Sequence, residues 1–387
     1  MKRTHSLYLD FAAASPLDPD VARVMQPFFS DFFANPSSTH ALGREVRQCL
    51  DAARARVAGL MGATTDEIIF THSGTESNNL AILGIARAHK HRGKHIISTP
   101  LEHSSVAEPL KQLAREGFEI TFVEIDEYGV VSLEDLRKQL RADTILVSMI
   151  AAHNEIGTVQ PIPEIAVTLH RFDKNIIFHI DACQYAGFFP LQVADLGVDA
   201  LTCNGSKLHG PKGVGMLYVR KGVHCEPLMY GGGQEWGKWS GTENAMSIVG
   251  FAQAFENTQI FIRNQSAVQS VATMRDEFFG VVRAAVPDVA LNGHSSRRLP
   301  NNLHITLPGF DTETLLVALD QAGLCVSSGS ACQSGALEKS PILGVLGKHP
   351  KKGAQLRVTF ARTTTRRQMQ QGAEILLATL QKFAKKF

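Results

Sequence analysis

Short runs of apolar and β-branched residues alternate with longer stretches of helical periodicity from residue 45 to residue 219. The strand-like runs are 67–70, 95–98, 119–123, 144–150, 176–180, 200–202 and 215–219. Helical patterns cover 45–61, 78–92, 106–115, 132–140 and 162–172. Strands that alternate with helices form a mostly parallel sheet, because each helix carries the chain back across the sheet. The pattern predicts an α/β fold with helices on both faces of the sheet.

The pattern changes near Gly250, where one long helical stretch is expected over 248–285, ending before Pro287. Beyond it lie strand patterns at 302–307 and 356–360 and helical patterns at 312–322 and 365–385. This second set predicts a smaller α+β domain. We therefore expect a large domain over 15–260 and a small domain formed by 1–14 and 261–387.

Composition and charge narrow the possible function classes. The chain has 387 residues, of which 44% are hydrophobic and 20% charged, as is usual for a globular enzyme of two domains. Its formal net charge of +2 gives no basis for strong binding to nucleic acid or membranes. The N-terminus carries no apolar signal region and no stretch reaches transmembrane length, so we expect a cytoplasmic protein.

A lysine and a carboxylate stand at neighbouring strand ends. Asp181 follows the apolar run 176–180, and Lys207 lies in a glycine-rich bend after the next strand. A lysine amine can bind the aldehyde of pyridoxal 5'-phosphate covalently, and a carboxylate can keep its pyridine nitrogen protonated. Taken singly, each residue is more often an ordinary strand-end aspartate or a surface lysine. Together they predict a pyridoxal phosphate site.

Three more loops follow strands. Residues 73–78 lie between a strand and a helix, where backbone N–H groups bind phosphate; Gly74 allows a close approach and Thr75 adds a hydroxyl donor. His103 and Asn154 also follow strands, at the edge where ligands bind such sheets. An imidazole there could stack on an aromatic ring and exchange protons. A turn that only caps a helix and a solvated loop histidine remain alternatives.

One cysteine has unusual surroundings. The six cysteines are Cys49, Cys183, Cys203, Cys225, Cys325 and Cys332. None forms a Cys-x-x-Cys pair, so neither a zinc site nor a disulfide framework is predicted. Cys332 lies in Ser327-Ser-Gly-Ser-Ala-Cys-Gln-Ser-Gly-Ala336, a run of small and polar residues that does not suit a core. We expect a mobile, accessible loop over about 325–345, whose cysteine suits a nucleophile.

A series of segments, in order along nearly the whole chain, carries a resemblance to one family. The strongest are Thr75-Glu-Ser-Asn-Asn, Glu102-His103, Asn154-Glu-Ile-Gly, His179-Ile-Asp-Ala-Cys-Gln184, Lys207 with Gly210-Pro-Lys-Gly, Gly231-Gly-Gly-Gln-Glu, Ser240-Gly-Thr-Glu-Asn and Ser327-Ser-Gly-Ser-Ala-Cys332. The chain resembles cysteine desulfurases of the NifS/IscS-like group. That group lies within the class V aminotransferase superfamily of fold-type I pyridoxal phosphate enzymes, so the resemblance implies the same fold and cofactor.

The resemblance also implies a role for each residue around the cofactor ring. Lys207 would bind the cofactor and then carry protons. Asp181 would pair with the pyridinium, and Gln184 would approach the phenolic oxygen. His103 would stack on the ring.

The cofactor phosphate would be shared between two chains. The resemblance implies contacts from Gly74, Thr75 and Ser206 of one chain. Thr242 would reach the same phosphate from a neighbouring subunit. A homodimer is therefore part of the implied active site.

The implied substrate is L-cysteine. Asn154 and Arg357 would hold its carboxylate, for which a guanidinium is well suited. Cys332 would attack the substrate sulfur, leaving L-alanine and an enzyme persulfide. An acceptor protein docking near Cys332 would receive the sulfur, for iron–sulfur cluster assembly or for thio-modification of tRNA or DNA.

Several positions depart from the family pattern. Asn204 and Ser206 stand where serine and histidine are common, and Trp236 and Trp239 stand where arginine is usual. The stretch after Cys332 also differs, and residues 347–353 are basic. These departures favour a dedicated sulfur donor for thio-modification as much as a general iron–sulfur donor.

Two other classes stay open. A selenocysteine lyase or another aminotransferase-like enzyme could use the same scaffold, although transamination does not need Cys332. A non-catalytic docking protein could keep the fold, although it would not need Lys207, Asp181 and His103.

Overall fold

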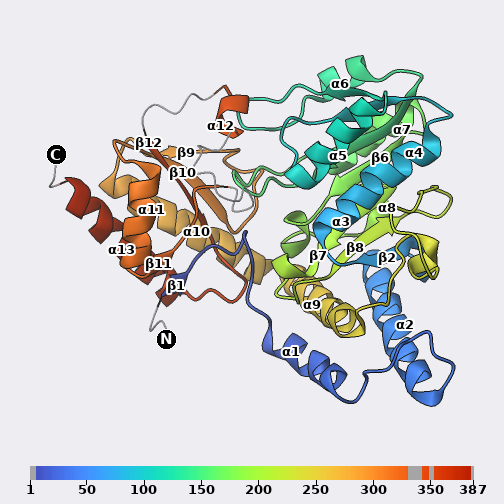
Figure 1. The fold of residues 1–387 in the computed structure, drawn as a ribbon. Helices are drawn as coiled ribbons and strands as arrows, with labels where there is room; N and C mark the ends of the chain where they lie inside the picture. The colour runs from blue at the N-terminus through green and yellow to red at the C-terminus, as the bar shows by residue number, and fades with distance from the viewer. Residues whose placement is uncertain (1–5, 330–341, 348–352, 385–387) are drawn as a thin grey trace.

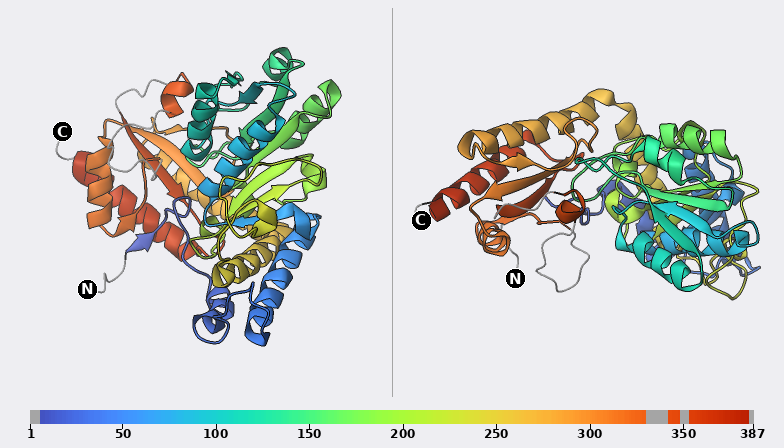
Figure 2. Two further views of the ribbon diagram at one scale, coloured as in Figure 1. Left: turned by 45° about the vertical axis from the view of Figure 1, so that its right-hand side comes forward. Right: turned by 90° about the horizontal axis from the view of Figure 1, so that it is seen from above.

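The computed structural model describes residues 6–329, 342–347 and 353–384, and these form a larger and a smaller part (Figure 1). Seen from above, the two parts lie side by side, joined by the helices α9 (Ala245–Arg263) and α10 (Gln265–Ala285) (Figure 2). No helix among the described residues is long and apolar enough to cross a membrane.

The larger part is built on a seven-stranded sheet with the order β2-β8-β7-β6-β5-β3-β4. The strands are β2 (Ile68–Thr71), β3 (His95–Ser98), β4 (Glu119–Phe122), β5 (Thr144–Ile150), β6 (Ile177–Asp181), β7 (Ala200–Asn204) and β8 (Gly215–Val219). β8 runs antiparallel to β7 and β2, and the pairs β7–β6, β6–β5, β5–β3 and β3–β4 are parallel. Every residue of β5 and β6 is buried, because helices cover both faces of a parallel sheet.

Two helical layers cover this sheet. One face packs against a core that includes α2 (Ala41–Met61), α7 (Ile162–Phe172) and α9. The opposite face packs against α4 (Ile85–His89) and α5 (Ser104–Arg115). The remaining elements of this part are α1 (Pro19–Met25), η1 (Gln26–Phe29), η2 (Thr65–Glu67), α3 (Gly74–Asn79), the π-helical turn η3 (Leu80–Gly84), α6 (Leu133–Gln139), η4 (Tyr185–Gly187), α8 (Val193–Leu196), η5 (Gly205–Lys207) and η6 (Glu235–Gly237). The predicted α/β fold with a mostly parallel sheet is confirmed.

The smaller part has its own core. Its sheet has the order β12-β10-β9, formed by β12 (Gly353–Thr359), β10 (Asn302–Pro308) and β9 (Ala290–Leu291), all antiparallel. The remaining elements are β1 (Leu7–Tyr8), β11 (Leu324–Cys325), α11 (Thr312–Gln321), α12 (Ile342–Val345) and α13 (Arg366–Ala384). β1 pairs with β11, so the chain's N-terminal segment belongs to the same apolar core as α10, α11 and α13.

The expected single helix over 248–285 is wrong, because two helices meet at Asn264. The side chain of Asn264 accepts a hydrogen bond from the N–H of Ala267 (3.2 Å) and caps the second helix. A capping side chain competes with continued helical hydrogen bonding, and here it ends one helix and starts the next.

Candidate active site

Most of the predicted site residues line one cavity of about 230 Å³. Those that line it are Gly74, Thr75, His103, Asn154, Asp181, Gln184, Ser206, Lys207 and Arg357. They come from loops at the carboxyl ends of β2, β3, β5, β6 and β7, and from β12 of the smaller part. Residue 332 lies outside the described residues.

Lys207 enters the cavity from η5, the short 3-10 turn that directly follows β7. Its Nζ donates a hydrogen bond to the carbonyl oxygen of Ala13. Gln184 donates from Nε2 to the carbonyl oxygen of Ala12 (2.9 Å). The segment between β1 and α1 therefore forms a wall of the cavity and orients two of its polar side chains.

Asp181 ends β6 as a buried carboxylate. Its Oδ2 accepts from Asn78 Nδ2 (2.8 Å), and its Oδ1 accepts from the N–H of Cys183 (2.9 Å). Both donors are uncharged. The negative charge of Asp181 is thus held in place and suited to a cationic ligand group inside the cavity, such as a protonated pyridine nitrogen.

His103 is the N-cap residue of α5, and its orientation is fixed by Ser105. Its Nδ1 accepts from the N–H of Ser105 (3.1 Å) and lies 2.7 Å from Ser105 Oγ. The same Oγ accepts from Asn78 Nδ2 (2.8 Å), so its hydroxyl hydrogen is available to His103 Nδ1. An Nδ1 that accepts leaves the hydrogen of a neutral imidazole on Nε2.

The helical run α3-η3-α4 begins at the cavity with Ser73 as N-cap and Gly74 as its first residue. A Cβ on Gly74 would lie 2.9 Å from Cys183 Sγ and 3.0 Å from Asn204 Nδ2, which is too close. The first N–H groups of a helix have no intrahelical partner, and they attract anions. This helix start therefore fits a phosphate, with Thr75 and Ser206 also lining the cavity.

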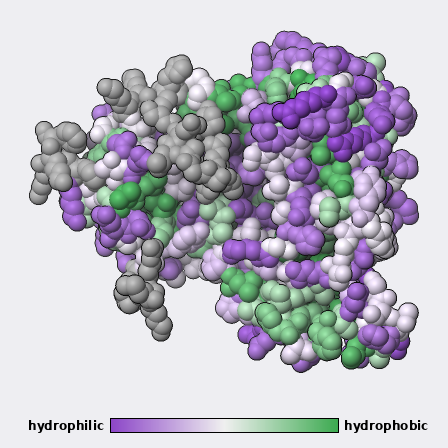
Figure 3. All heavy atoms as spheres, in the orientation of Figure 1, coloured by the Kyte–Doolittle hydropathy of each residue, from purple (hydrophilic) through white to green (hydrophobic). Residues whose placement is uncertain are grey.

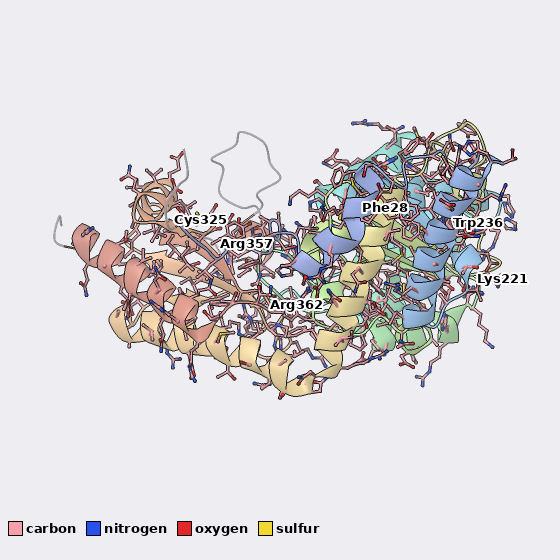
Figure 4. The ribbon with its side chains drawn as sticks, turned by 90° about the horizontal axis from the view of Figure 1, so that it is seen from below. Phe28, Lys221, Trp236, Cys325, Arg357 and Arg362 are labelled. Carbon is pink, nitrogen blue, oxygen red and sulfur yellow. The ribbon has the colours of Figure 1, made fainter. Side chains whose placement is uncertain are left out.

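Arg357 reaches the cavity from β12 of the smaller part (Figure 4). Its NH2 forms an ion pair with Asp10 Oδ1 (2.7 Å), and its NH1 donates to the carbonyl oxygen of Asn154 (3.1 Å). Arg357 is only 1% exposed, yet its Nε makes no hydrogen bond with a described residue. A buried, unpaired N–H of this kind fits a ligand carboxylate.

Thr242 does not line this cavity within the chain. It is exposed and lines a separate, smaller cavity with Phe70 and Gly241. Of the two tryptophans that depart from the family pattern, Trp239 is buried and Trp236 is half exposed. Figure 4 shows Trp236 at the far end of the larger part from Arg357.

Three residues that shape the site had no predicted role. Asn78 and Ser105 bridge Asp181 to His103, and Asp10 orients Arg357. A signal existed for Asn78, since it stands one turn after Gly74 on a short helix rich in polar residues, and its side chain is buried there. Asp10 is distant from Arg357 in sequence, and nothing in the local pattern links the two.

The chain is similar to known proteins over nearly its whole length. The Aminotransferase class-V family model matches residues 7–371. The cysteine desulfurase IscS of Dictyoglomus turgidum is 43% identical over 383 residues, covering 99% of this chain and 96% of that protein. A solved NifS-like protein superposes with a TM-score of 0.91 at 32% identity, covering 97% of this chain and 99% of that one. A structure of SspA in complex with cysteine gives a TM-score of 0.80 at 29% identity, covering 93% and 100%.

The fold, the residues of the cavity and these relatives together indicate an enzyme of the class-V aminotransferase type. The chain belongs to the class-V aminotransferase family and, within it, to the cysteine desulfurases. The resemblance inferred from the motifs and the predicted enzyme class are therefore confirmed. The separate roles of the site residues stay predictions.

Proposed function

We propose that this cysteine desulfurase uses pyridoxal phosphate to convert L-cysteine into L-alanine, and that Cys332 receives the sulfur. One observation carries the proposal: Lys207, Asp181 and Arg357 line the same cavity, although Asp181 ends β6, Lys207 follows β7 and Arg357 lies within β12 of the other sheet. A covalent anchor, a carboxylate for the pyridine nitrogen and a cation for the substrate carboxylate are thus available together.

The residues of the cavity fit the cofactor in their chemistry. A Cβ on Gly74 would collide with Cys183 and Asn204, so the helix starts with a glycine, and its first N–H groups can be offered to a phosphate. Asp181 would hold the pyridine nitrogen in its protonated form, and Lys207 would bind the aldehyde. When bound, pyridoxal phosphate supplies an electron sink for bonds to the substrate's α-carbon.

The substrate amino acid would be oriented by its carboxylate. Arg357 is fixed by Asp10 and by the carbonyl of Asn154, so its unpaired Nε can bind without reorganisation. Lys207 Nζ and His103 Nε2 would then hold and move protons within the same cavity, which is the work expected of an amine and a neutral imidazole. The related SspA was solved with cysteine, which supports this choice of substrate.

Sulfur would leave the substrate by attack of the Cys332 thiolate on the substrate sulfur. An S–S bond forms and the Cβ–S bond breaks; the electron pair of the broken bond stays on Cβ and takes up a proton, giving alanine. The thiol and L-cysteine thus become a persulfide and L-alanine, with no added oxidant. Burial raises the pKa of Cys203 and Cys225 to about 12, so these two described thiols do not compete as nucleophiles.

Two variants test the roles of the lysine and the cysteine. Lys207→Ala should abolish alanine production and the absorbance of the bound cofactor. Cys332→Ser should retain the cofactor absorbance but form no protein persulfide, whereas Cys325→Ser in the same region should behave like the unchanged protein. Unchanged persulfide and alanine yields from Cys332→Ser would refute the assignment of the nucleophile.

We further propose a homodimer with composite sites, to which Thr242 contributes from the second chain. Large apolar side chains are exposed on the larger part, where Figure 3 shows hydrophobic residues over α1 and η1. They include Phe29, Phe33, Leu42, Tyr230 and Trp236. Mixing Thr242→Ala and Lys207→Ala chains should restore activity, because some dimers then contain one intact site. No recovery after verified subunit exchange would contradict the composite site.

The persulfide sulfur would pass to an acceptor protein docking near Cys332. Iron–sulfur assembly and thio-modification of tRNA or DNA are the two candidate destinations. Deleting the gene and measuring thio-nucleosides beside iron–sulfur enzyme activities separates them, because only the pathway served should fail.

A further inference from the structure

His304 has no role in the chemistry described above, yet it lies beside the site. It is a fully buried residue of β10, and its partner in the register with β12 is Arg357. The two residues lie directly opposite each other in an antiparallel pair. His304 is therefore held at the edge of the substrate-binding region by the sheet itself.

Two neighbours fix the tautomer of His304. Its Nε2 lies 3.1 Å from the carbonyl oxygen of Ser328, which can only accept a hydrogen bond, so Nε2 must carry the hydrogen. Its Nδ1 lies 3.0 Å from Asn292 Nδ2, an amide that donates here and also donates to Thr306 Oγ1 (2.9 Å). The imidazole thus accepts at Nδ1 and donates at Nε2.

The surroundings keep this imidazole neutral. Burial lowers the pKa of His304 to about 4, and the nearby guanidinium groups of Arg357 and Arg298 act in the same direction. His153 also lies close, and burial lowers its pKa to about 3. Because a protonated His304 would turn an N–H toward the amide donor of Asn292, the hydrogen-bond pattern and the electrostatics favour the same state.

Ser328, which His304 holds, and its neighbour Ser327 lie just before Cys332 in the sequence. Ser327 forms an isolated β-bridge with Arg357, in which the Arg357 N–H donates to the Ser327 carbonyl (2.6 Å) and the Ser327 N–H donates back (3.3 Å). Ser328 is held in turn by His304. Cys332 follows Ser328 by four residues in the sequence.

We infer that His304 is a positioning residue for sulfur transfer: its imidazole holds the Ser328 carbonyl and so fixes where the segment carrying Cys332 leaves the sheet. The inference rests on the proposed role of Cys332. Substrate binding and sulfur transfer would be structurally linked, because Arg357 both lines the cavity and pairs with Ser327. His304, which holds Ser328, and Arg357, which is proposed to bind the substrate carboxylate, are paired in the same short stretch of sheet.

Variants of His304 distinguish its hydrogen bond to Ser328 from a general contribution to packing in the core. His304→Leu removes the donor and should lower kcat by about tenfold, the effect of losing one buried hydrogen bond, with KM for L-cysteine little changed. His304→Gln places an amide N–H near the position of Nε2 and should recover most of that loss. His95→Leu is the matched control, since His95 is also fully buried and bonded at both ring nitrogens, to Thr144 and Thr121, but lies at the opposite end of its strand from the site.

A second measurement does not depend on turnover. Hydrogen exchange of a peptide covering 324–329 should become faster in His304→Leu than in His95→Leu or His304→Gln, and the rate at which iodoacetamide alkylates Cys332 should change in the same variant. Unchanged exchange and alkylation in His304→Leu, or equal defects in His304→Gln and His304→Leu, would overturn the inference. If Cys332→Ser keeps full activity, the proposed function fails instead, and the exchange data still report whether His304 anchors Ser328.

Discussion

Asn78 donates a hydrogen bond from Nδ2 to Asp181 Oδ2 over 2.8 Å, joining the helix that starts at the cavity to the end of β6. The second Nδ2 hydrogen reaches Ser105 Oγ, also at 2.8 Å. One amide group therefore sets the position of the carboxylate proposed to face the pyridine nitrogen and, through Ser105, that of His103. The two sides of the proposed cofactor site are coupled through hydrogen bonds from this one uncharged amide.

The first prediction concerns this amide. Asn78→Ala should weaken the affinity for pyridoxal phosphate by about 10–100-fold, because hydrogen bonds to a buried charge are among the stronger ones. The measurement is a titration of the apoprotein followed by absorbance. Asn79→Ala is the control, since the adjacent Asn79 donates to the backbone of Thr75 and does not contact Asp181. Equal affinities in the two variants would contradict the proposed role of Asn78.

Much of the site could be predicted from sequence because of the topology of the sheet. Residues that follow parallel strands meet at one edge, so Asp181, His103 and Asn154 could be expected to lie together from strand order alone. Lys207 follows β7 in the same way, before β8 runs back antiparallel. The contacts between Asp10 and Arg357 depend on a tertiary arrangement that no periodicity encodes.

The incorrect prediction of a single helix over 248–285 has a local cause. Apolar residues continue at helical spacing on both sides of Asn264, so the pattern indicated one helix. Asn264 is a residue type that favours helix caps, and its side chain ends α9 and begins α10.

Substrate binding can be tested with two matched arginines. Arg357 and Arg362 each pair with an aspartate of the N-terminal segment, Asp10 and Asp18, but only Arg357 lines the proposed cofactor cavity. Arg357→Lys should lower kcat/KM for L-cysteine on the order of 100-fold, because an ammonium cannot replace a planar guanidinium that binds three groups at once. Arg362→Lys should leave kcat/KM within a few-fold. The cofactor absorbance should be unchanged in both, and a larger loss from Arg362→Lys would reverse the assignment.

Stability should depend on a buried ion pair far from the cavity. Arg54 binds Glu235 through two hydrogen bonds (2.7 and 2.8 Å), and its guanidinium lies over the rings of Phe70 and Trp236. Glu235→Gln removes the negative partner and leaves a buried cation. The expected loss of about 3–5 kcal/mol should lower the thermal unfolding midpoint by about 4–6 °C for a chain of this size.

An exposed ion pair provides the comparison for that measurement. Asp20 and Arg23 are one helical turn apart and mostly exposed. Asp20→Asn should shift the midpoint by no more than about 1 °C. Similar shifts for Glu235→Gln and Asp20→Asn would show that the buried pair contributes little.

The last prediction is a pH dependence of stability that originates at Glu102. Its Oε1 accepts hydrogen bonds from Thr99 Oγ1 (2.7 Å) and from the N–H of Ile150 (2.8 Å), while its buried Oε2 makes none with a described residue. Burial raises the pKa of this carboxyl from 4.5 to about 8. Between these two values the unfolded chain has released a proton that the folded protein keeps. The contribution of Glu102 to the free energy of unfolding is therefore complete below pH 4.5 and is lost as the pH rises toward 8.

Glu102→Gln keeps the accepting Oε1 and removes the ionisation. The thermal unfolding midpoint of Glu102→Gln, relative to that of the unchanged protein, should rise steadily from pH 5 to pH 8. The buried histidines do not affect this difference, because both proteins contain them. Glu116→Gln should show no trend from pH 5 to pH 8. The hydrogen bonds from Arg87 lower the pKa of Glu116 to about 2, so the stabilisation they give is lost only as the pH falls from 4.5 toward 2. A difference between Glu102→Gln and the unchanged protein that stays constant from pH 5 to pH 8 would mean that Glu102 is ionised in the folded protein, and its carboxylate would then require a cationic partner.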